Sequence, residues 1–138
     1  MAGTFWDYFV PYQEDVDKAL QDLRDQVFRT GQYKRWPSVR GATIEEVVAE
    51  SGYSGTHSIL DIERVSAFPA LQAVSPLSAK RLQEVFGTDK PTRQMVMIED
   101  MIEDDELEEL NPCYQGIYII VYNHGKPDQI CFVGSSGD

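Results

Sequence analysis

The sequence predicts an α+β fold in a single domain spanning residues 1–138. We expect a roughly four-stranded, mainly antiparallel sheet with a C-terminal hairpin, and about four helices packed mainly on one face of the sheet. Two observations predict this class. The hydrophobic pattern changes between the period of a strand and the period of a helix along the chain. Strands and helices also do not alternate regularly, as they would in a parallel α/β fold.

The N-terminal elements are the most clearly patterned. Residues 4–10 are aromatic and β-branched and precede Pro11, which predicts a first strand. From Glu14 onward, apolar residues recur at spacings of three and four, which predicts an amphipathic helix that ends at Gly31. Thr43 then stands three residues before Glu46. This is the spacing of a capping box, and it predicts a short helix through residue 50.

The middle of the chain carries shorter patterns. Residues 56–62 are predicted as a second strand. Pro76 is placed in the first turn of a third helix, where its missing N–H is not needed, and Gly87 ends that helix. A fourth helix is predicted from Pro91, with an apolar face made of Met95, Ile98 and Ile102.

The C-terminal residues predict a β-hairpin. Residues 117–122 are β-branched or aromatic, residues 123–126 tolerate a positive φ, and residues 129–133 complete the second strand. Because residues 117–121 are almost continuously hydrophobic, we expect this strand to be central and covered on both faces.

The composition predicts a protein of the reducing cytoplasm. No apolar run approaches the roughly 18 residues of a membrane span, and the N-terminus lacks a basic region followed by an apolar stretch. Cys113 and Cys131 match no metal spacing and are too few for a disulfide framework, so each is expected to be a buried or half-buried thiol. We expect no cofactor and no metal.

The hairpin resembles the opening of a GIY-YIG nuclease through Gly116, Tyr118 and the residues from Phe132 to Gly134. The resemblance implies that Tyr118 corresponds to the first family tyrosine, but Phe132 has no hydroxyl to replace the second. The family places its catalytic arginine and its metal-binding glutamate downstream of this hairpin, and the sequence ends at Asp138. The similarity is therefore interpreted as incidental.

A second resemblance covers nearly the whole chain. Its landmarks are the segments Phe9–Tyr12, Gly55–Ile62, Pro76–Ser78, Phe86–Arg93 and Phe132–Gly134. Together they resemble a group of small bacterial proteins without an assigned function. This resemblance implies that the chain ends naturally at the hairpin, and it implies no activity and no site residues.

The most distinctive chemistry is a cluster of carboxylates in residues 99–109, here called the acidic segment. The formal net charge is −11, and residues 91–138 contribute −8 of it. The acidic segment holds eight carboxylates within eleven residues and no lysine or arginine: Glu99, Asp100, Glu103, Asp104, Asp105, Glu106, Glu108 and Glu109. Such a field attracts basic partners and repels nucleic acid and anionic membranes. The simpler alternative is a solvated face that keeps the protein soluble.

These observations favour a non-enzymatic protein-interaction module, similar in kind to an inhibitor or immunity protein, that binds a basic protein through the acidic segment. We expect no partner among nucleic acids or membranes, and the oligomeric state stays open. The alternative is a small hydrolase or nucleotide-processing enzyme whose site is assembled in space around His57 and Tyr118. An enclosed pocket around either side chain would favour that alternative.

Two further groups of residues carry weaker signals. Thr56, His57, Ser58 and Asp61 combine the residue types of a hydrolase, but neighbouring strand residues point to opposite faces. The loop from Tyr33 to Arg40 places cations beside aromatic residues, as phosphate or single-stranded nucleic acid requires. Because the formal net charge of the molecule is −11, we expect these lysine and arginine side chains to pair with its own carboxylates instead.

Overall fold

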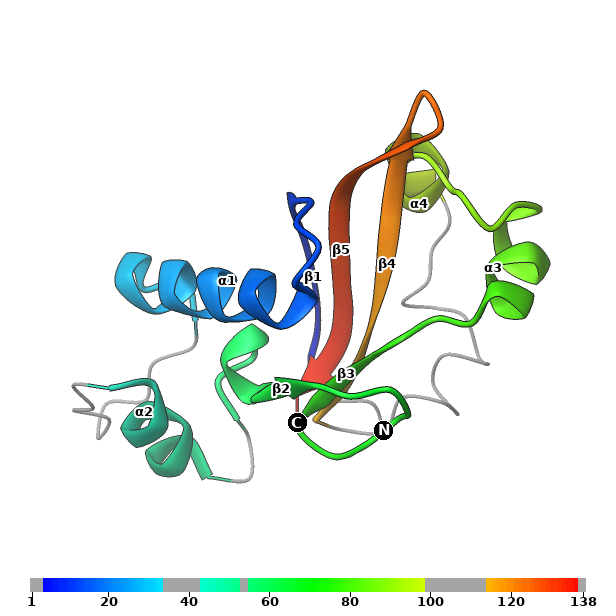
Figure 1. Ribbon diagram of the computed structural model, residues 1–138. Coiled ribbons are helices and arrows are strands. Elements are labelled where there is room, and N and C mark those ends of the chain that lie inside the picture. The colour runs from blue at the N-terminus through cyan, green and yellow to red at the C-terminus, as the bar shows by residue number, and fades with distance from the viewer. Residues whose placement is uncertain (1–3, 34–42, 53–54, 99–113, 137–138) are drawn as a thin grey trace.

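The computed structural model describes residues 4–33, 43–52, 55–98 and 114–136. These residues form a five-stranded mixed sheet in the order β1-β5-β4-β3-β2 (Figure 1). The strands are β1 (Thr4–Pro11), β2 (Arg64–Val65), β3 (Ala73–Pro76), β4 (Gln115–Asn123) and β5 (Lys126–Ser136).

The sheet contains more strands, and more parallel pairing, than the sequence predicts. β5 pairs antiparallel with both β1 and β4, which confirms the first strand and the C-terminal hairpin. β3, however, pairs in parallel with both β4 and β2. The expectation of a roughly four-stranded, mainly antiparallel sheet is corrected on this point. With two and four residues, β2 and β3 are too short for a period of two to be recognised.

The helices are α1 (Val16–Thr30), α2 (Ile44–Ser51), α3 (Ala79–Phe86) and α4 (Arg93–Ile98), with a short 3-10 helix, η2 (Ile59–Asp61). The predicted caps of α1 and α2 are confirmed. α1 ends at Gly31 in the left-handed conformation (φ 69°), and the Thr43 hydroxyl accepts a hydrogen bond from the Glu46 N–H at 3.2 Å. These caps satisfy backbone groups that a helix end leaves without partners.

Both faces of the sheet carry a hydrophobic core. α1 and η2 pack on one face with strand residues that include Trp6, Val74 and Phe132. Leu77, α3 and α4 pack on the other face over alternate residues of β4 and β5, among them Ile119 and Cys131. Figure 1 shows α1 and α2 on one side of the sheet and α3 and α4 on the other. The expectation that helices lie mainly on one face is therefore wrong.

Three local predictions also need correction. Residues 56–62 form a loop and η2 instead of a strand, because the side chains of Ser58 and Asp61 bind local backbone N–H groups. Pro76 ends β3, and the third helix begins after it with Ser78 as its N-cap. In α4 Val96 is buried, whereas Met95 of the predicted apolar face is 42% exposed, and Ile102 of that face lies outside the described residues.

Cys131 lies in the core on β5, as expected for a structural thiol. Its burial raises its pKa to about 12, so the thiol stays protonated and unreactive at neutral pH. Within the part of the chain that the structure describes, no helix is long and apolar enough to cross a membrane.

Candidate functional site

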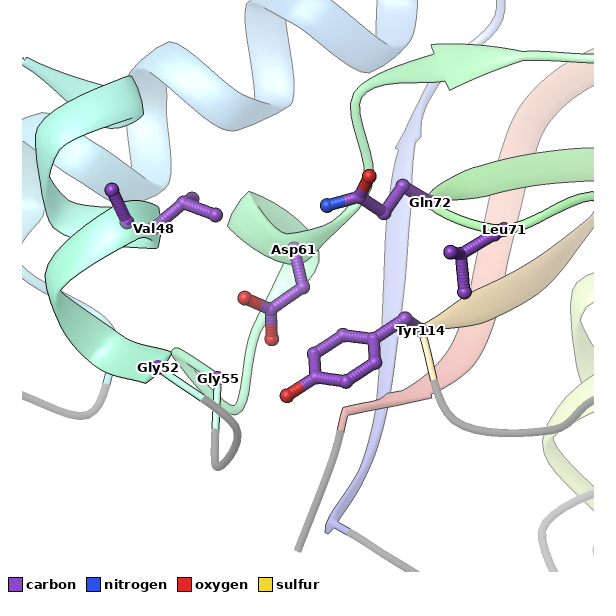
Figure 2. A pocket seen from close by; sticks show the side chains of 8 residues that line it. Val48, Gly52, Gly55, Asp61, Leu71, Gln72 and Tyr114 are labelled. Carbon is purple, nitrogen blue, oxygen red and sulfur yellow. The ribbon is translucent and has the colours of Figure 1, made fainter.

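A cavity of about 350 Å³ opens between α2, η2 and the residues just before β3 and β4 (Figure 2). We call it the Asp61 cavity. It is lined by Val48, Ala49, Gly52, Gly55, Asp61, Leu71, Gln72 and Tyr114. Its volume falls at the lower end of the range of small-molecule sites, and a few polar groups stand among apolar walls, as is typical of binding pockets.

Asp61 provides the charged group of this cavity, and the loop before η2 holds it in place. Its side chain is almost fully buried, with 2% of the residue surface exposed. Both carboxylate oxygens accept the backbone N–H of Thr56, each at 3.0 Å. Figure 2 shows the carboxylate directed into the space between the end of α2 and the Tyr114 ring. The acid is therefore oriented by backbone and faces the cavity.

Gly55 makes this arrangement possible. Its φ of +71° lies in the left-handed region that favours glycine. A Cβ at this position would lie 2.7 Å from the Asp61 Oδ2 atom and 2.9 Å from Cε1 of Tyr114. Because backbone, carboxylate and ring meet here, a larger residue would displace Asp61 or Tyr114.

Two other lining residues have strained backbones. Gln72 and Tyr114 both have positive φ values, 57° and 67°. The Gln72 N–H donates to the Tyr114 carbonyl at 2.6 Å, and the Tyr114 N–H donates to the Ser135 carbonyl at 2.9 Å. Each non-glycine residue held in the left-handed region lowers the stability of the fold by about 1–3 kcal/mol, and residues with such backbone strain cluster at functional sites. The backbone just before β3 and β4 therefore places the side chains of Gln72 and Tyr114 at the cavity.

The loop between β2 and β3 adds exposed apolar surface beside the cavity. Leu71, which lines it, is 60% exposed, and Phe68 of the same loop is 76% exposed. Large apolar side chains gathered next to a pocket are typical of interaction surfaces.

A second cavity, of about 380 Å³, also borders α2, and we call it the Arg24 cavity. Val48 and Ala49 line both cavities, and Arg24, Glu45 and Glu63 complete this one. Arg24 is 8% exposed, and burial lowers its pKa, although the surrounding carboxylates oppose that shift. Its guanidinium donates to the Gln21 side chain and to the Leu60 carbonyl, while its Nε has no acceptor among the described residues. Arg24 thus connects α1 to η2.

The site residues predicted from the sequence are mostly untested. The acidic segment, residues 99–109, lies outside the described residues. So do Cys113 and residues 34–40 of the basic loop. Tyr33, which begins that loop, stacks on Phe28 with ring centroids 6.2 Å apart. The proposal of a partner-binding acidic face therefore stays a prediction.

Of the described hydrolase candidates, Asp61 alone lines either of these two cavities. Ser58 is fully buried, and its hydroxyl is 2.7 Å from that of Thr56 and accepts the Leu60 N–H. Tyr118 packs against the core that contains Phe132, and the centroids of the two rings are 6.4 Å apart. Burial raises the pKa of the Tyr118 hydroxyl. His57, with a φ of 56°, is half-buried. Neither His57 nor Tyr118 lines the Asp61 cavity or the Arg24 cavity.

The nuclease-like glycines have a packing role. Gly116 and Gly134 are paired across β4 and β5, and Trp6 of β1 is the partner of Gly134 on its other side. A Cβ at Gly134 would lie 2.6 Å from the Trp6 ring, and one at Gly116 would lie 3.1 Å from it. Both positions are therefore explained by the indole ring that crosses them.

The sequence singled out Asp61 only as part of a supposed hydrolase cluster and missed Leu71, Gln72 and Tyr114. The pair of glycines around residues 52–55 was the one local signal of a close approach. Among the described residues, no group of three or more histidines, cysteines or carboxylates could hold a metal ion. Comparison of the chain with protein-family models, curated proteins and solved structures found no match.

Proposed function

We propose that the chain is a non-enzymatic protein-interaction module that binds a basic protein, in the manner of an inhibitor or immunity protein. The observation that carries this proposal is the acidic segment, with eight carboxylates in eleven residues and no lysine or arginine. Carboxylates four residues apart on a helix repel each other by about 0.2–0.5 kcal/mol per pair. A basic partner would offset that repulsion and would associate faster because of the complementary charge.

The described surface around α2 supports the same class of partner. Glu45, Glu46 and Glu50 are exposed on this helix, which has no basic residue in its last turn. Glu63 is exposed beside them at the Arg24 cavity. Negative charge is therefore also present on the described surface around α2, the helix that borders both cavities. A cytoplasmic location is part of this proposal, because Cys131 is a free thiol and not part of a disulfide.

A capture experiment tests the proposal. The immobilised chain is incubated with a lysate of the organism that encodes it, at about 50 mM and about 500 mM salt, which differ several-fold in screening length. The test variant replaces Glu103, Asp104, Asp105 and Glu106 with their amides. The matched control makes the same change of four charges at Glu14, Asp25, Asp89 and Asp128, which are all exposed.

We expect the wild-type chain and the control variant to retain one basic protein at low salt and to release it at high salt. The acidic-segment variant is expected to retain little of it. Equal retention by the two variants would contradict a specific role of the acidic segment. Retention of no basic protein by the wild-type chain would contradict the proposed function.

A further inference from the structure

We propose that a second copy of the chain pairs with the outer edge of β1, so that two five-stranded sheets join into one continuous sheet across a two-fold axis. This inference goes beyond the proposed function and does not depend on it. β1 is an edge strand of eight residues, and within the described part of the chain only β5 pairs with it. A long edge strand presents a row of backbone N–H and C=O groups that can pair with another chain.

The register of β1 on β5 shows which backbone groups face outward from this edge. The N–H of Tyr12, the residue just after β1, donates to the Asp128 carbonyl at 3.0 Å. Because backbone groups alternate in direction along a strand, the even-numbered residues of β1 bond to β5 and the odd-numbered residues face outward. The outward set is Phe5, Asp7, Phe9 and Pro11. Pro11 fits such a position, since proline has no N–H and is confined to the open side of an edge strand.

The outward residues select one register for a pair of identical antiparallel strands. When the two-fold axis lies at Tyr8, Asp7 stands opposite Phe9 of the second copy, and Phe5 stands opposite Pro11 of the second copy. Asp7 and Phe9 of opposite copies then exchange both backbone hydrogen bonds, and the Pro11 carbonyl accepts one from Phe5. A pair centred on Asp7 would instead place two carboxylates directly opposite each other, which destabilises a sheet. β1 is therefore complementary to itself about Tyr8.

Charged side chains beside the strand support the same register. Asp7 is exposed and lies on the same face of the sheet as Phe9, because the two residues are two positions apart in β1. The exposed Arg93 of α4 covers the Phe9 ring, with the central carbon of its guanidinium 4.5 Å from the ring centroid. In the proposed pair, the Asp7 carboxylate of each copy therefore comes next to the Arg93 guanidinium of the other.

The Arg93 guanidinium can bind that carboxylate and keep its contacts within the chain. One of its N–H groups donates to the Gln129 side chain at 3.2 Å, and a guanidinium has five N–H donors. An unrelated strand would offer the edge its backbone groups but no matched pair of charges. The complementarity of Asp7 and Arg93 across the axis thus identifies a second copy of this chain as the occupant of the edge.

Sedimentation equilibrium of the full chain tests the pairing. The protein is examined from about 5 to about 500 µM, because the dimer fraction depends on concentration by mass action. We expect wild type to dimerise with a micromolar dissociation constant. Asp7→Pro removes one outward N–H and leaves the bonds of β1 to β5, so it is expected to fold and to dimerise at least tenfold more weakly. Wild type that stays monomeric at about 500 µM would overturn the inference.

Charge reversal tests the ion pair between the two copies. Asp7→Arg and Arg93→Asp each bring like charges together at two symmetric positions, and each is expected to weaken dimerisation at least tenfold. The double variant Asp7→Arg/Arg93→Asp restores opposite charges and keeps the net charge of −11, and its dissociation constant is expected to return to within about threefold of wild type.

The matched control is Asp25→Arg, which makes the same change of charge as Asp7→Arg at an exposed position of α1. We expect it to leave dimerisation unchanged. Undiminished dimerisation by both single variants, a loss of equal size in the control, or a double variant as weak as the single variants would overturn the inference.

Oxidative cross-linking tests the register. In a Cys113→Ser background, whose remaining Cys131 is buried, Tyr8→Cys places one thiol opposite its own copy across the two-fold axis. Residues opposite each other in a non-hydrogen-bonded pair have Cα atoms about 4.5 Å apart, which a disulfide can span. We expect Tyr8→Cys to form a covalent dimer on mild oxidation faster than Asp7→Cys, which faces itself only in the register centred on Asp7.

No covalent dimer from Tyr8→Cys, or a faster one from Asp7→Cys, would overturn the inference. If Tyr8→Cys does not fold, the sedimentation of Asp7→Pro decides in its place, and dimerisation by that variant equal to wild type would also overturn the inference.

Discussion

The indole of Trp6 lies against the backbone of Gly134, so that a Cβ at residue 134 would stand 2.6 Å from both Cη2 and Cζ2 of the ring. The same Cβ would be 2.7 Å from the Gln115 carbonyl oxygen. This contact fixes β1 against the C-terminal hairpin and accounts for the glycine that resembled a nuclease motif.

We expect Gly134→Ala to lower the free energy of unfolding by about 3 kcal/mol, because the rigid indole and the backbone cannot both move away. Gly125→Ala is the control. It has a φ of +76° and open space around its Cβ, so only backbone strain of about 1 kcal/mol applies. Urea unfolding curves measure both variants. Equal losses of stability in the two variants would show that the Trp6 ring does not exclude a Cβ at residue 134.

Asp61 is expected to stabilise the fold through the hydrogen bond that it accepts from the Thr56 N–H. Asp61→Ala leaves the fully buried Thr56 N–H without its acceptor and should cost about 1–3 kcal/mol. Asp61→Asn keeps an acceptor oxygen and should cost less than about 1 kcal/mol. Urea midpoints of the two variants check this order, and an alanine variant as stable as wild type would contradict it.

The buried charge of Arg24 is expected to destabilise the fold, whereas the packing of its side chain is expected to stabilise it. Its pKa is lowered, so the charged form is less favourable in the folded chain than in water, despite the nearby carboxylates. We expect Arg24→Met, which keeps much of the volume, to raise the free energy of unfolding by about 1 kcal/mol. Arg24→Ala should lower it, because the side chain fills space between α1 and η2. A methionine variant less stable than wild type, or an alanine variant at least as stable as wild type, would refute this account.

The Cys131 thiol is expected to make stability fall at alkaline pH. Its pKa rises from 9.0 to about 12 on folding. Above pH 9 the unfolded chain loses this proton while the folded chain keeps it, so stability is full below pH 9 and declines toward pH 12. The slope contributed is at most about 1.4 kcal/mol per pH unit.

The measurement compares Cys113→Ser with the double variant Cys113→Ser/Cys131→Ala by urea unfolding between pH 8 and pH 11. Tyr8 and Tyr118 also have raised pKa values, and they add the same loss to both variants. We expect a steeper decline in the variant that retains Cys131, and parallel curves would contradict the assigned pKa shift.

Elements with long patterns or local caps could be predicted from the sequence, whereas the cavity could not. α1 and the hairpin each carry a complete hydrophobic period, and the Thr43 cap acts within four residues. β3 is different, because its strand character comes from parallel pairing with β4, about forty residues away. The positions of Gln72 and Tyr114 depend on that pairing.

Asp61 shows a related limit of sequence analysis. Its neighbours Thr56, His57 and Ser58 include β-branched and polar residues that suggested a strand with a hydrolase cluster. In the folded chain, Ser58 and Asp61 instead bind the N–H groups of Leu60 and Thr56 and form η2. Whether such a short segment forms a strand depends on the competition between side-chain hydrogen bonds to local backbone and the backbone hydrogen bonds of a sheet. The hydrophobic pattern does not show which of the two prevails.

The rate of association with the captured basic partner tests the central claim most directly. It is measured by stopped-flow mixing at salt concentrations from about 50 to 500 mM, for wild type and for the variant with amides at residues 103–106. We predict that the association rate constant of wild type falls at least tenfold over this range and that the variant is slower at low salt with a weaker salt dependence. An association rate that is independent of salt and equal in the two proteins would contradict recognition through the acidic segment.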